Sequence, residues 1–332
     1  MSHYPLQSNI FDDEVAKEPI RAGFGRGLKA AGEADERVVA LCADLTESTQ
    51  MHLFKNAFPE RFIEIGVAEQ NLVTVASGLA RAGKIPFTSS YAAFSPGRNW
   101  EQIRTTAALN EQPVKVVGSH AGVSVGPDGA THQMLEDIAL MRVLPHMVVV
   151  APGDSVEAEK ATKLIAKNDK PSYLRLAREK TPIFSTEDSP FEIGKAYVLR
   201  EGHDITLLGT GTMTYELLVA AKELESKGVS AEVVHVPTIK PLDEETILAS
   251  VRKTGRALSA EEAQIAGGFG SAIAELLSEK MPTPLWRVGM RDRFGESGKP
   301  DELLDLFGLT GEKIAVQTKE FINNTPQYHR DY

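Results

Sequence analysis

Short apolar runs alternate with helix-like segments along most of the chain. The apolar runs expected to form strands in the first half are residues 37–45, 61–66, 84–91, 114–119, 147–152 and 172–177. The segments expected to be helices, because apolar residues recur every three or four positions, are residues 14–32, 69–82, 98–109 and 154–167. This alternation predicts a mainly parallel sheet that is covered by helices on both faces.

The alternation is interrupted once and then resumes. Residues 181–194 contain Pro182 and Pro190 among mixed polar residues, and we interpret them as a linker. A second series of short strands and helices follows, which predicts a smaller α/β domain. The fold class expected is therefore α/β, with two doubly wound domains. The expected regions are an N-terminal extension (1–17), a first domain (18–180), the linker (181–194) and a C-terminal domain (195–332).

Composition and charge are typical of a soluble globular protein. The 332 residues are 42% hydrophobic and 25% charged, and no apolar run of 18 residues predicts a transmembrane helix. The N-terminus lacks a signal-peptide pattern and Cys42 is the only cysteine, so we expect a cytoplasmic protein without an internal disulfide. The formal charge of −10, without a cluster of Lys and Arg, argues against nucleic acid or a membrane surface as partner.

An ionisable residue stands at an otherwise apolar join. In "IEIGVAEQNLVTVASGLA", residues 63–80, Glu69 lies where an expected strand turns into an expected helix. A carboxyl group at such a join is unusual in a buried element unless it has a partner. Glu69 is therefore the first residue that we single out for chemistry.

Three glycine motifs lie near expected helix starts. They are "GFGRGLKA", "GTGTMTYE" and "GGFGSA", and none has the spacing and context of a dinucleotide or P-loop fingerprint. We interpret them as tight turns or close helix–strand contacts.

The polar loop "SHAGVSVGPDGATHQ" is more informative. It follows an expected strand, which places it at the carboxyl edge of the sheet, where ligands bind in open α/β folds. It contains His120, Asp128, His132 and Gln133 among four glycines in residues 118–129. These side chains could bind sugar hydroxyls, shuttle protons or, with less support from their spacing, hold a metal. The alternative is a solvated loop with a turn at "GPDG".

Aromatic residues also gather where an expected strand ends, in "FTSSYAAFSPGRNW". Phe87 is interpreted as a core residue. For Tyr91 and Phe94 the pattern leaves both a core position and a position in a cleft open. Arg21, Ser48, His120 and Arg178 are scattered, and the pattern alone would place each of them on the surface.

Three segments together resemble a known family. "IEIGVAEQN", then "FTSSYAAF", then "GVSVGPDGATHQMLEDIALMRVLPHMVVVAP" look like the carboxyl-terminal half of transketolase and, less closely, 1-deoxyxylulose-5-phosphate synthase. The resemblance extends from about residue 18 over nearly the whole chain. It implies a thiamine diphosphate enzyme built from three α/β domains. The two that this chain resembles are the pyrimidine-binding domain and the C-terminal domain.

The resemblance also implies a partner chain. The Gly-Asp-Gly motif by which the family holds the diphosphate through a metal is absent from this sequence. We therefore expect one subunit of a split transketolase. A separate N-terminal subunit would bind the diphosphate and Mg²⁺ or Ca²⁺, so we expect no metal ligand in this chain. An α2β2 assembly is expected, in which this chain also associates with itself.

The resemblance implies roles for residues on the cofactor side. Glu69 matches the glutamate that hydrogen-bonds the aminopyrimidine and tunes it as a proton relay. Asp44 matches an aspartate near the thiazolium. Tyr91 and Phe94 match aromatics around the pyrimidine, with Phe94 as the stacking residue.

The resemblance implies a second set of roles on the substrate side. Asp128 and His132 match groups that bind the substrate hydroxyls, and His132 would also transfer protons. The residues that match the set holding the sugar phosphate are Arg21, Ser48, His120 and Arg178. Arginine suits a phosphate because its planar fork of donors matches the oxygens.

The activity expected is transfer of a two-carbon ketol unit from a ketose phosphate to an aldose phosphate, as in the pentose phosphate pathway. Four alternatives stand beside it. Two are thiamine enzymes: a 1-deoxyxylulose-5-phosphate synthase and the β subunit of a 2-oxoacid dehydrogenase. The third is a non-catalytic transketolase-like subunit with a structural or regulatory role. The fourth is a sugar-phosphate binding module without a cofactor, in which Glu69 would have no role.

Overall fold

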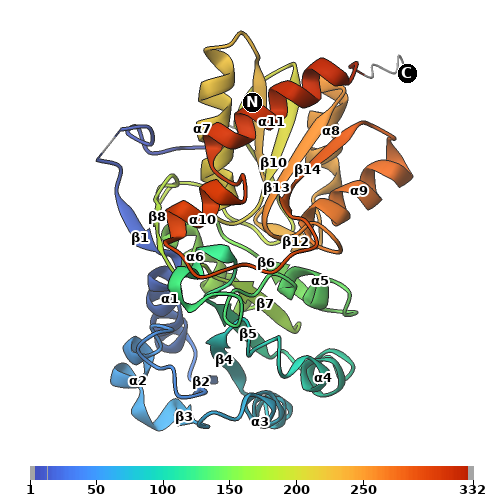
Figure 1. Cartoon of the computed structure of the whole chain (residues 1–332). Coiled ribbons are helices and arrows are strands. Elements are labelled where there is room, and N and C mark those ends of the chain that lie inside the picture. Colours follow the sequence, from blue (N-terminus) through green and yellow to red (C-terminus); the bar gives the residue numbers. More distant parts are fainter. Residues whose placement is uncertain (1–3, 13, 328–332) are drawn as a thin grey trace.

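The computed structural model describes residues 4–12 and 14–327 and divides them between two α/β domains. The first domain occupies the lower, blue-to-green part of Figure 1, and the smaller C-terminal domain the upper, yellow-to-red part. Each domain has a mainly parallel sheet with helices packed on it, so the predicted fold class is confirmed.

The sheet of the first domain has seven strands, and six of them are mutually parallel. In spatial order they are β12 (Thr238–Lys240), β6 (Val148–Val150), β7 (Ser172–Arg175), β5 (Lys115–Ser119), β4 (Ile85–Tyr91), β2 (Val38–Cys42) and β3 (Phe62–Glu64). Strands β2 and β5, each with a neighbour on both sides, are buried along their whole length, as expected for a parallel sheet covered on both faces.

The helices of the first domain are short except for three. They are α1 (Ile20–Ala34), α2 (His52–Ala57), α3 (Glu69–Arg81), α4 (Trp100–Gln102), α5 (Asp137–Arg142) and α6 (Ser155–Ile165). Three further turns are η1 (Pro59–Arg61), the π-helical η2 (Ile103–Ala108) and η3 (Val123–Asp128).

The first helix differs from its prediction at its start. It was expected from residue 14 but begins at Ile20, because residues 17–19 form strand β1 (Lys17–Pro19), which pairs with β8 (Lys180–Pro182). The motif "GFGRGLKA" lies within α1. A Cβ on Gly23 would come within 1.8 Å of the Ser155 carbonyl oxygen on α6. This motif therefore serves close packing of two helices, rather than the predicted tight turn or contact between a helix and a strand.

The sheet of the C-terminal domain has five strands. In spatial order they are β14 (Leu285–Met290), β13 (Ala257–Gln264), β10 (Ile205–Gly209), β11 (Ala231–His235) and β9 (Tyr197–Arg200), the last of which is antiparallel. Its helices are α7 (Met213–Glu225), α8 (Glu244–Thr254), α9 (Phe269–Lys280), α10 (Pro300–Leu306) and α11 (Gly311–Asn324).

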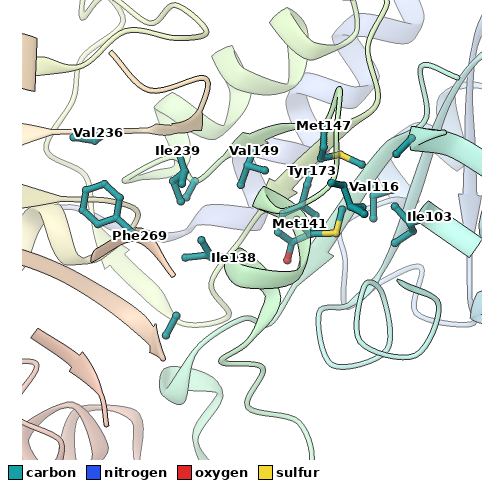
Figure 2. Packing of buried hydrophobic residues seen from close by; sticks show 14 of the residues in the cluster. Ile103, Val116, Ile138, Met141, Met147, Val149, Tyr173, Val236, Ile239 and Phe269 are labelled. Carbon is teal, nitrogen blue, oxygen red and sulfur yellow. The ribbon is translucent and has the colours of Figure 1, made fainter. Parts of the chain in front are cut away.

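The two domains share a hydrophobic core. Strand β12 follows β11 of the C-terminal sheet along the chain, yet it pairs antiparallel with β6 of the first sheet. Beside it, Val236, Ile239 and Phe269 belong to the same buried cluster as Ile138 and Val149 of the first domain. Figure 2 shows these side chains together with other members of the cluster. Burial of such apolar surface fixes the domains relative to each other.

The segment before β1 is clamped between the domains. Tyr4 is buried, its ring lies 5.2 Å from that of Tyr197, and its hydroxyl donates to Glu157 Oε1 at 2.6 Å. The other carboxylate oxygen of Glu157 is 2.7 Å from Nε2 of His235 in the C-terminal domain. This chain segment, the first domain and the C-terminal domain therefore meet at one buried carboxylate.

Among the helices of the described residues, none has the length and apolar character needed to cross a membrane. The same part of the chain shows no group of three or more His, Cys, Asp or Glu side chains arranged to hold a metal ion.

Candidate functional site

Several predicted site residues lie at the carboxyl edge of the first sheet. Asp44 follows β2, Tyr91 ends β4 and His120 follows β5, three neighbouring parallel strands. A cavity of about 510 Å³ lies at the opposite edge, beside Val38 and Ile85, which begin their strands. Because open parallel sheets bind ligands at the carboxyl ends of their strands, we place the site at the edge that holds the polar cluster.

Glu69 is the first residue of α3 and only 2% of it is exposed. A carboxylate in the first turn interacts favourably with the helix dipole, which is a structural reason for an acid at this position. Arg98 Nη1 donates to Glu69 Oε2 at 2.8 Å, and Asn99 Nδ2 donates to the Glu69 carbonyl at 2.8 Å. The Arg98 side chain is half exposed, so it lies between the buried Glu69 carboxylate and the solvent.

Four rings form a cluster next to this ion pair. Tyr91 stacks on Phe94 at 6.1 Å and on His120 at 3.9 Å between ring centroids. His132 meets Phe94 edge-on at 5.3 Å. The Arg98 guanidinium lies over the Phe94 ring, 4.7 Å from its centroid. The cluster therefore joins the end of β4 to both ends of the polar loop.

His120 is held in an unusual conformation. Its φ of 58° is in the left-handed region, which costs a non-glycine residue free energy and is found at functional sites. Its Nδ1 lies 2.9 Å from the Ser119 hydroxyl. Burial, followed by the positive charges of Arg21 and Arg178, lowers the pKa of His120 to about 3. The imidazole is consequently neutral at pH 7.

Two guanidinium groups act on this histidine. Arg21 lies at the start of α1 and Arg178 follows β7. Burial lowers the pKa of Arg21, Glu179 opposes that shift, and Arg178 adds to it. Nε and Nη1 of Arg21 are buried without a hydrogen-bond partner among residues 4–12 and 14–327. Arg178 Nη1 donates to the Val125 carbonyl at 2.5 Å. Buried guanidinium donors without an acceptor are suited to an anion.

The loop after β5 needs its glycines. Gly122 has φ +93° and Gly129 has φ +72°, conformations that side chains disfavour. Gln133 fastens the loop from within, because its Nε2 donates to the carbonyls of Val123 and Gly126 at 3.1 and 3.3 Å. The loop is therefore an ordered turn that returns His132 to the ring cluster.

Comparison with known sequences agrees with this geometry. Residues 17–183 match the family described as the transketolase pyrimidine binding domain, and residues 194–314 match the transketolase C-terminal domain. The chain belongs to the transketolase family. The predicted family is thereby confirmed.

The transketolase relatives include proteins of similar length. The chain is 45% identical to a putative transketolase C-terminal section of Methanocaldococcus jannaschii, over 91% of this chain and 95% of that protein. It is 46% identical to a 6-deoxy-6-sulfo-D-fructose transketolase subunit of a Clostridium species, over 93% and 96%. A solved structure of a split-gene transketolase, described as an inactive beta4 tetramer, aligns with a TM-score of 0.86 at 43% identity, over 92% of this chain and 98% of that one.

The structure brings together seven of the ten transketolase-type residues singled out from the sequence. They are Glu69, Tyr91, Phe94, His120, His132, Arg21 and Arg178. The other three lie apart from these contacts within the described part of the chain. Asp44 is exposed, with a φ of 58° and its N–H donating to Glu64 Oε1. Ser48 is half-buried in the turn before α2, and Asp128 is exposed at the tip of the polar loop.

Sequence analysis missed two residues that touch Glu69. Arg98 supplies its ion pair and Asn99, which is fully buried, binds its carbonyl. Both stand in the quoted stretch "FSPGRNW", four and five residues after Phe94. The sequence feature that could have identified Arg98 is that it is the only Lys or Arg in "FTSSYAAFSPGRNW", where an expected strand is followed by an expected helix.

Proposed function

We propose that this chain is the C-terminal subunit of a split transketolase, which transfers a two-carbon ketol unit from a ketose phosphate to an aldose phosphate. The observation that carries the proposal is the buried carboxylate of Glu69, which Arg98 joins to the Phe94 ring. Tyr91 and His120 continue from Phe94 towards two guanidinium groups. A proton-relay carboxylate at one end and an anion site at the other suit a reaction on a phosphorylated sugar.

The cofactor side fits an aminopyrimidine. Glu69 is a buried carboxylate that can accept a hydrogen bond from a ring nitrogen, and Phe94 offers an aromatic face next to it. Arg98 is half exposed and can leave that face. Tyr91 would border the ring, and Asp44 would approach the thiazolium. Thiamine diphosphate, when bound, supplies the carbanion chemistry that breaks and forms the carbon–carbon bond.

The substrate side fits a sugar with an anionic end. Arg21 and Arg178 would bind the phosphate through their fork of donors, and neutral His120 and Ser48 would add hydrogen bonds. Asp128 and His132 would bind the hydroxyls beside the reacting carbon. His132 would also move protons to and from the substrate oxygen.

A separate subunit is proposed for the diphosphate. Relatives described as a transketolase C-terminal section and as a transketolase subunit are covered over 95% and 96% of their length by this chain. We infer an N-terminal subunit that binds the diphosphate through Mg²⁺ or Ca²⁺, in an α2β2 assembly. The chain alone would associate with itself and lack activity, like the split-gene transketolase that is described as an inactive beta4 tetramer.

A second donor class is supported by one relative. The Clostridium protein, at 46% identity, is named as a subunit acting on 6-deoxy-6-sulfo-D-fructose. A sulfonate and a phosphate both present oxygens to a guanidinium, so Arg21 and Arg178 suit either. The candidate donors are therefore a ketose phosphate and a 6-sulfonated ketose.

The proposal is tested by reconstitution. The purified chain is assayed alone and with the product of a neighbouring reading frame that carries Gly-Asp-Gly, with thiamine diphosphate, Mg²⁺ and an aldose phosphate acceptor. Each ketose donor is supplied in turn. Ketol transfer by the mixture but not by either chain alone is the expected result, and robust transfer by this chain alone would contradict the split assembly.

A further inference from the structure

The C-terminal domain supports the loop that bears His132 and Asp128. The loop's η3 turn packs on α10, and a Cβ on Gly129 would come within 2.5 Å of the Ser297 hydroxyl. Gln133 Nε2 also donates to the Glu296 carbonyl at 2.9 Å. The loop belongs to the first domain, but some of the residues that it packs against belong to the C-terminal domain.

A buried carboxylate makes a further polar contact between this loop and the C-terminal domain. Glu262 lies in β13 of the C-terminal domain and is 2% exposed. Its Oε1 accepts from the Ser124 N–H at 2.5 Å, within the loop. Its Oε2 accepts from the hydroxyl of Thr212 at 3.1 Å, next to the start of α7. The two oxygens therefore connect two domains.

The surroundings of Glu262 leave it little freedom. Its backbone carbonyl accepts from Arg175 Nη2 at 2.8 Å, and Arg175 Nε donates to Asp137 Oδ2 at 2.8 Å. A Cβ on Gly122 would come within 2.4 Å of the Glu262 carboxyl carbon, so the loop backbone approaches the carboxylate closely. Burial raises the pKa of Glu262, and Arg175 opposes that shift. Removal of this side chain would leave the buried Ser124 N–H without its acceptor.

We propose that Glu262 is a positioning residue through which the C-terminal domain fixes the loop of His132 and Asp128. The inference rests on the proposed function for the part that these two residues play in binding the donor sugar. In this proposal the C-terminal domain contributes to the reaction by holding the loop in place, without contacting the substrate itself.

Hydrogen exchange of the full chain tests the positioning directly. Glu262→Ala is expected to speed amide exchange in residues 120–133 by about 10-fold or more, because a hydrogen bond to a charged group is lost. Exchange in α3 is expected to stay unchanged. Glu262→Gln is expected to restore protection, because its amide oxygen can accept from Ser124 and its amide nitrogen can donate to the Thr212 oxygen.

The matched control is the adjacent residue of the same strand. Glu261 is equally buried, but its carboxylate accepts from the N–H groups of Phe269 and Gly270 at the start of α9. Glu261→Ala is expected to leave exchange in the loop at the level of the unmodified protein. Equal acceleration of loop exchange in both alanine variants would overturn the proposal, because it would indicate general loss of stability.

Kinetics of the reconstituted enzyme supply the second readout. Glu262→Ala is expected to lower kcat/KM for the donor by up to about 100-fold while thiamine diphosphate affinity is kept, since a displaced loop misplaces the groups that orient the sugar. Unchanged loop exchange would sink the proposal whatever the kinetics. Absence of ketol transfer in the unmodified assembly would instead refute the proposed function and leave the exchange result standing. If Glu262→Ala does not fold, Glu262→Asp is tested in its place, because the shorter side chain withdraws the carboxylate from the Ser124 N–H. Faster loop exchange in Glu262→Asp than in the unmodified protein is expected, and unchanged loop exchange would overturn the proposal.

Discussion

Arg98 donates to Glu69 at 2.8 Å and lies over the Phe94 ring at 4.7 Å from its centroid. A planar cation thus occupies the aromatic face and the carboxylate together, the two groups that we propose for the aminopyrimidine. The buried carboxylate obtains a charged partner by this arrangement. Arg98 is half exposed, so it can withdraw without disturbing the core.

Removal of this cation is expected to destabilise the chain in the absence of cofactor. Arg98→Ala leaves the Glu69 carboxylate buried without a charged partner, while the exposure of Arg98 moderates the effect. A loss of about 1 kcal/mol in the free energy of unfolding at pH 7 is expected. Urea unfolding followed by circular dichroism measures it.

The control for Arg98 comes from the same segment. Arg104 lies in η2, is exposed, and forms no ion pair with the described residues. Arg104→Ala is expected to shift the unfolding midpoint by less than half as much. Identical midpoints for the two variants would show that the pair with Glu69 adds nothing to stability.

Substitution of Glu69 tests the proton relay. Glu69→Gln keeps the size of the side chain and a hydrogen-bond acceptor but removes the carboxylate. Turnover of the reconstituted enzyme is expected to fall by about 100-fold or more, the usual weight of a general acid–base group. The fold is expected to persist, as judged by circular dichroism. Glu101→Gln, at an exposed position, is the control, and full activity of Glu69→Gln would remove Glu69 from the mechanism.

Local sequence patterns predicted the two sheets and, within the site, Glu69 and the polar loop. The runs that became β2, β4 and β5 are short and bounded by turn-forming or polar residues, and they are buried along their whole length except at the two ends of β4. Such short runs are recognised as strands without knowledge of the fold. Strand direction then placed the polar loop at the carboxyl edge. Glu69 stood out because a charge at the start of a buried helix needs a local reason.

Contacts between segments that are distant along the chain were not predicted from the sequence. Tyr4 was assigned to an extension, yet it binds Glu157, 153 residues away. Strand β12 joins the first sheet from within the C-terminal domain, and Glu262 meets the loop 138 residues before it. Each of these depends on how two domains pack, which no periodicity of a single chain segment encodes. The family resemblance supplied the phosphate set for the same reason, since Arg21 and Arg178 are unremarkable one at a time.

The two arginines are expected to govern affinity for the anionic end of the donor. Arg21→Ala and Arg178→Ala each remove charged donors from a partly buried site. A rise of about 10- to 100-fold in KM is expected for a phosphorylated donor, with little change in kcat. Steady-state kinetics with the reconstituted enzyme measure both constants.

An unphosphorylated ketose separates phosphate binding from a general effect. With that donor, the arginine variants and the unmodified enzyme are expected to have similar kinetic constants. Lys29→Ala, an exposed cation on the same helix as Arg21, controls for loss of surface charge. Equal losses on both donors would argue against contact between the arginines and the phosphate.

His120 is expected to make folding sensitive to acid. The unfolded chain takes up a proton on this residue below pH 6.5, the ordinary pKa, whereas the folded chain does so only near pH 3. The folded state binds fewer protons between these values, so the contribution to stability is complete above pH 6.5 and is lost as the pH falls towards 3. The slope from this one group is at most about 1.4 kcal/mol per pH unit.

A pair of histidine variants isolates that contribution. His146 shares the left-handed backbone of His120, with φ of 64° against 58°, but its side chain is half exposed. Asparagine tolerates this conformation, so His120→Asn and His146→Asn carry similar backbone costs. The free energy of unfolding of His120→Asn is expected to depend less steeply on pH between 6.5 and 4 than that of the unmodified chain. His146→Asn is expected to retain the original slope. Parallel plots of the free energy of unfolding against pH for all three proteins would show that His120 takes up its proton equally in both states. The inferred burial of a neutral imidazole near two guanidinium groups would then be wrong.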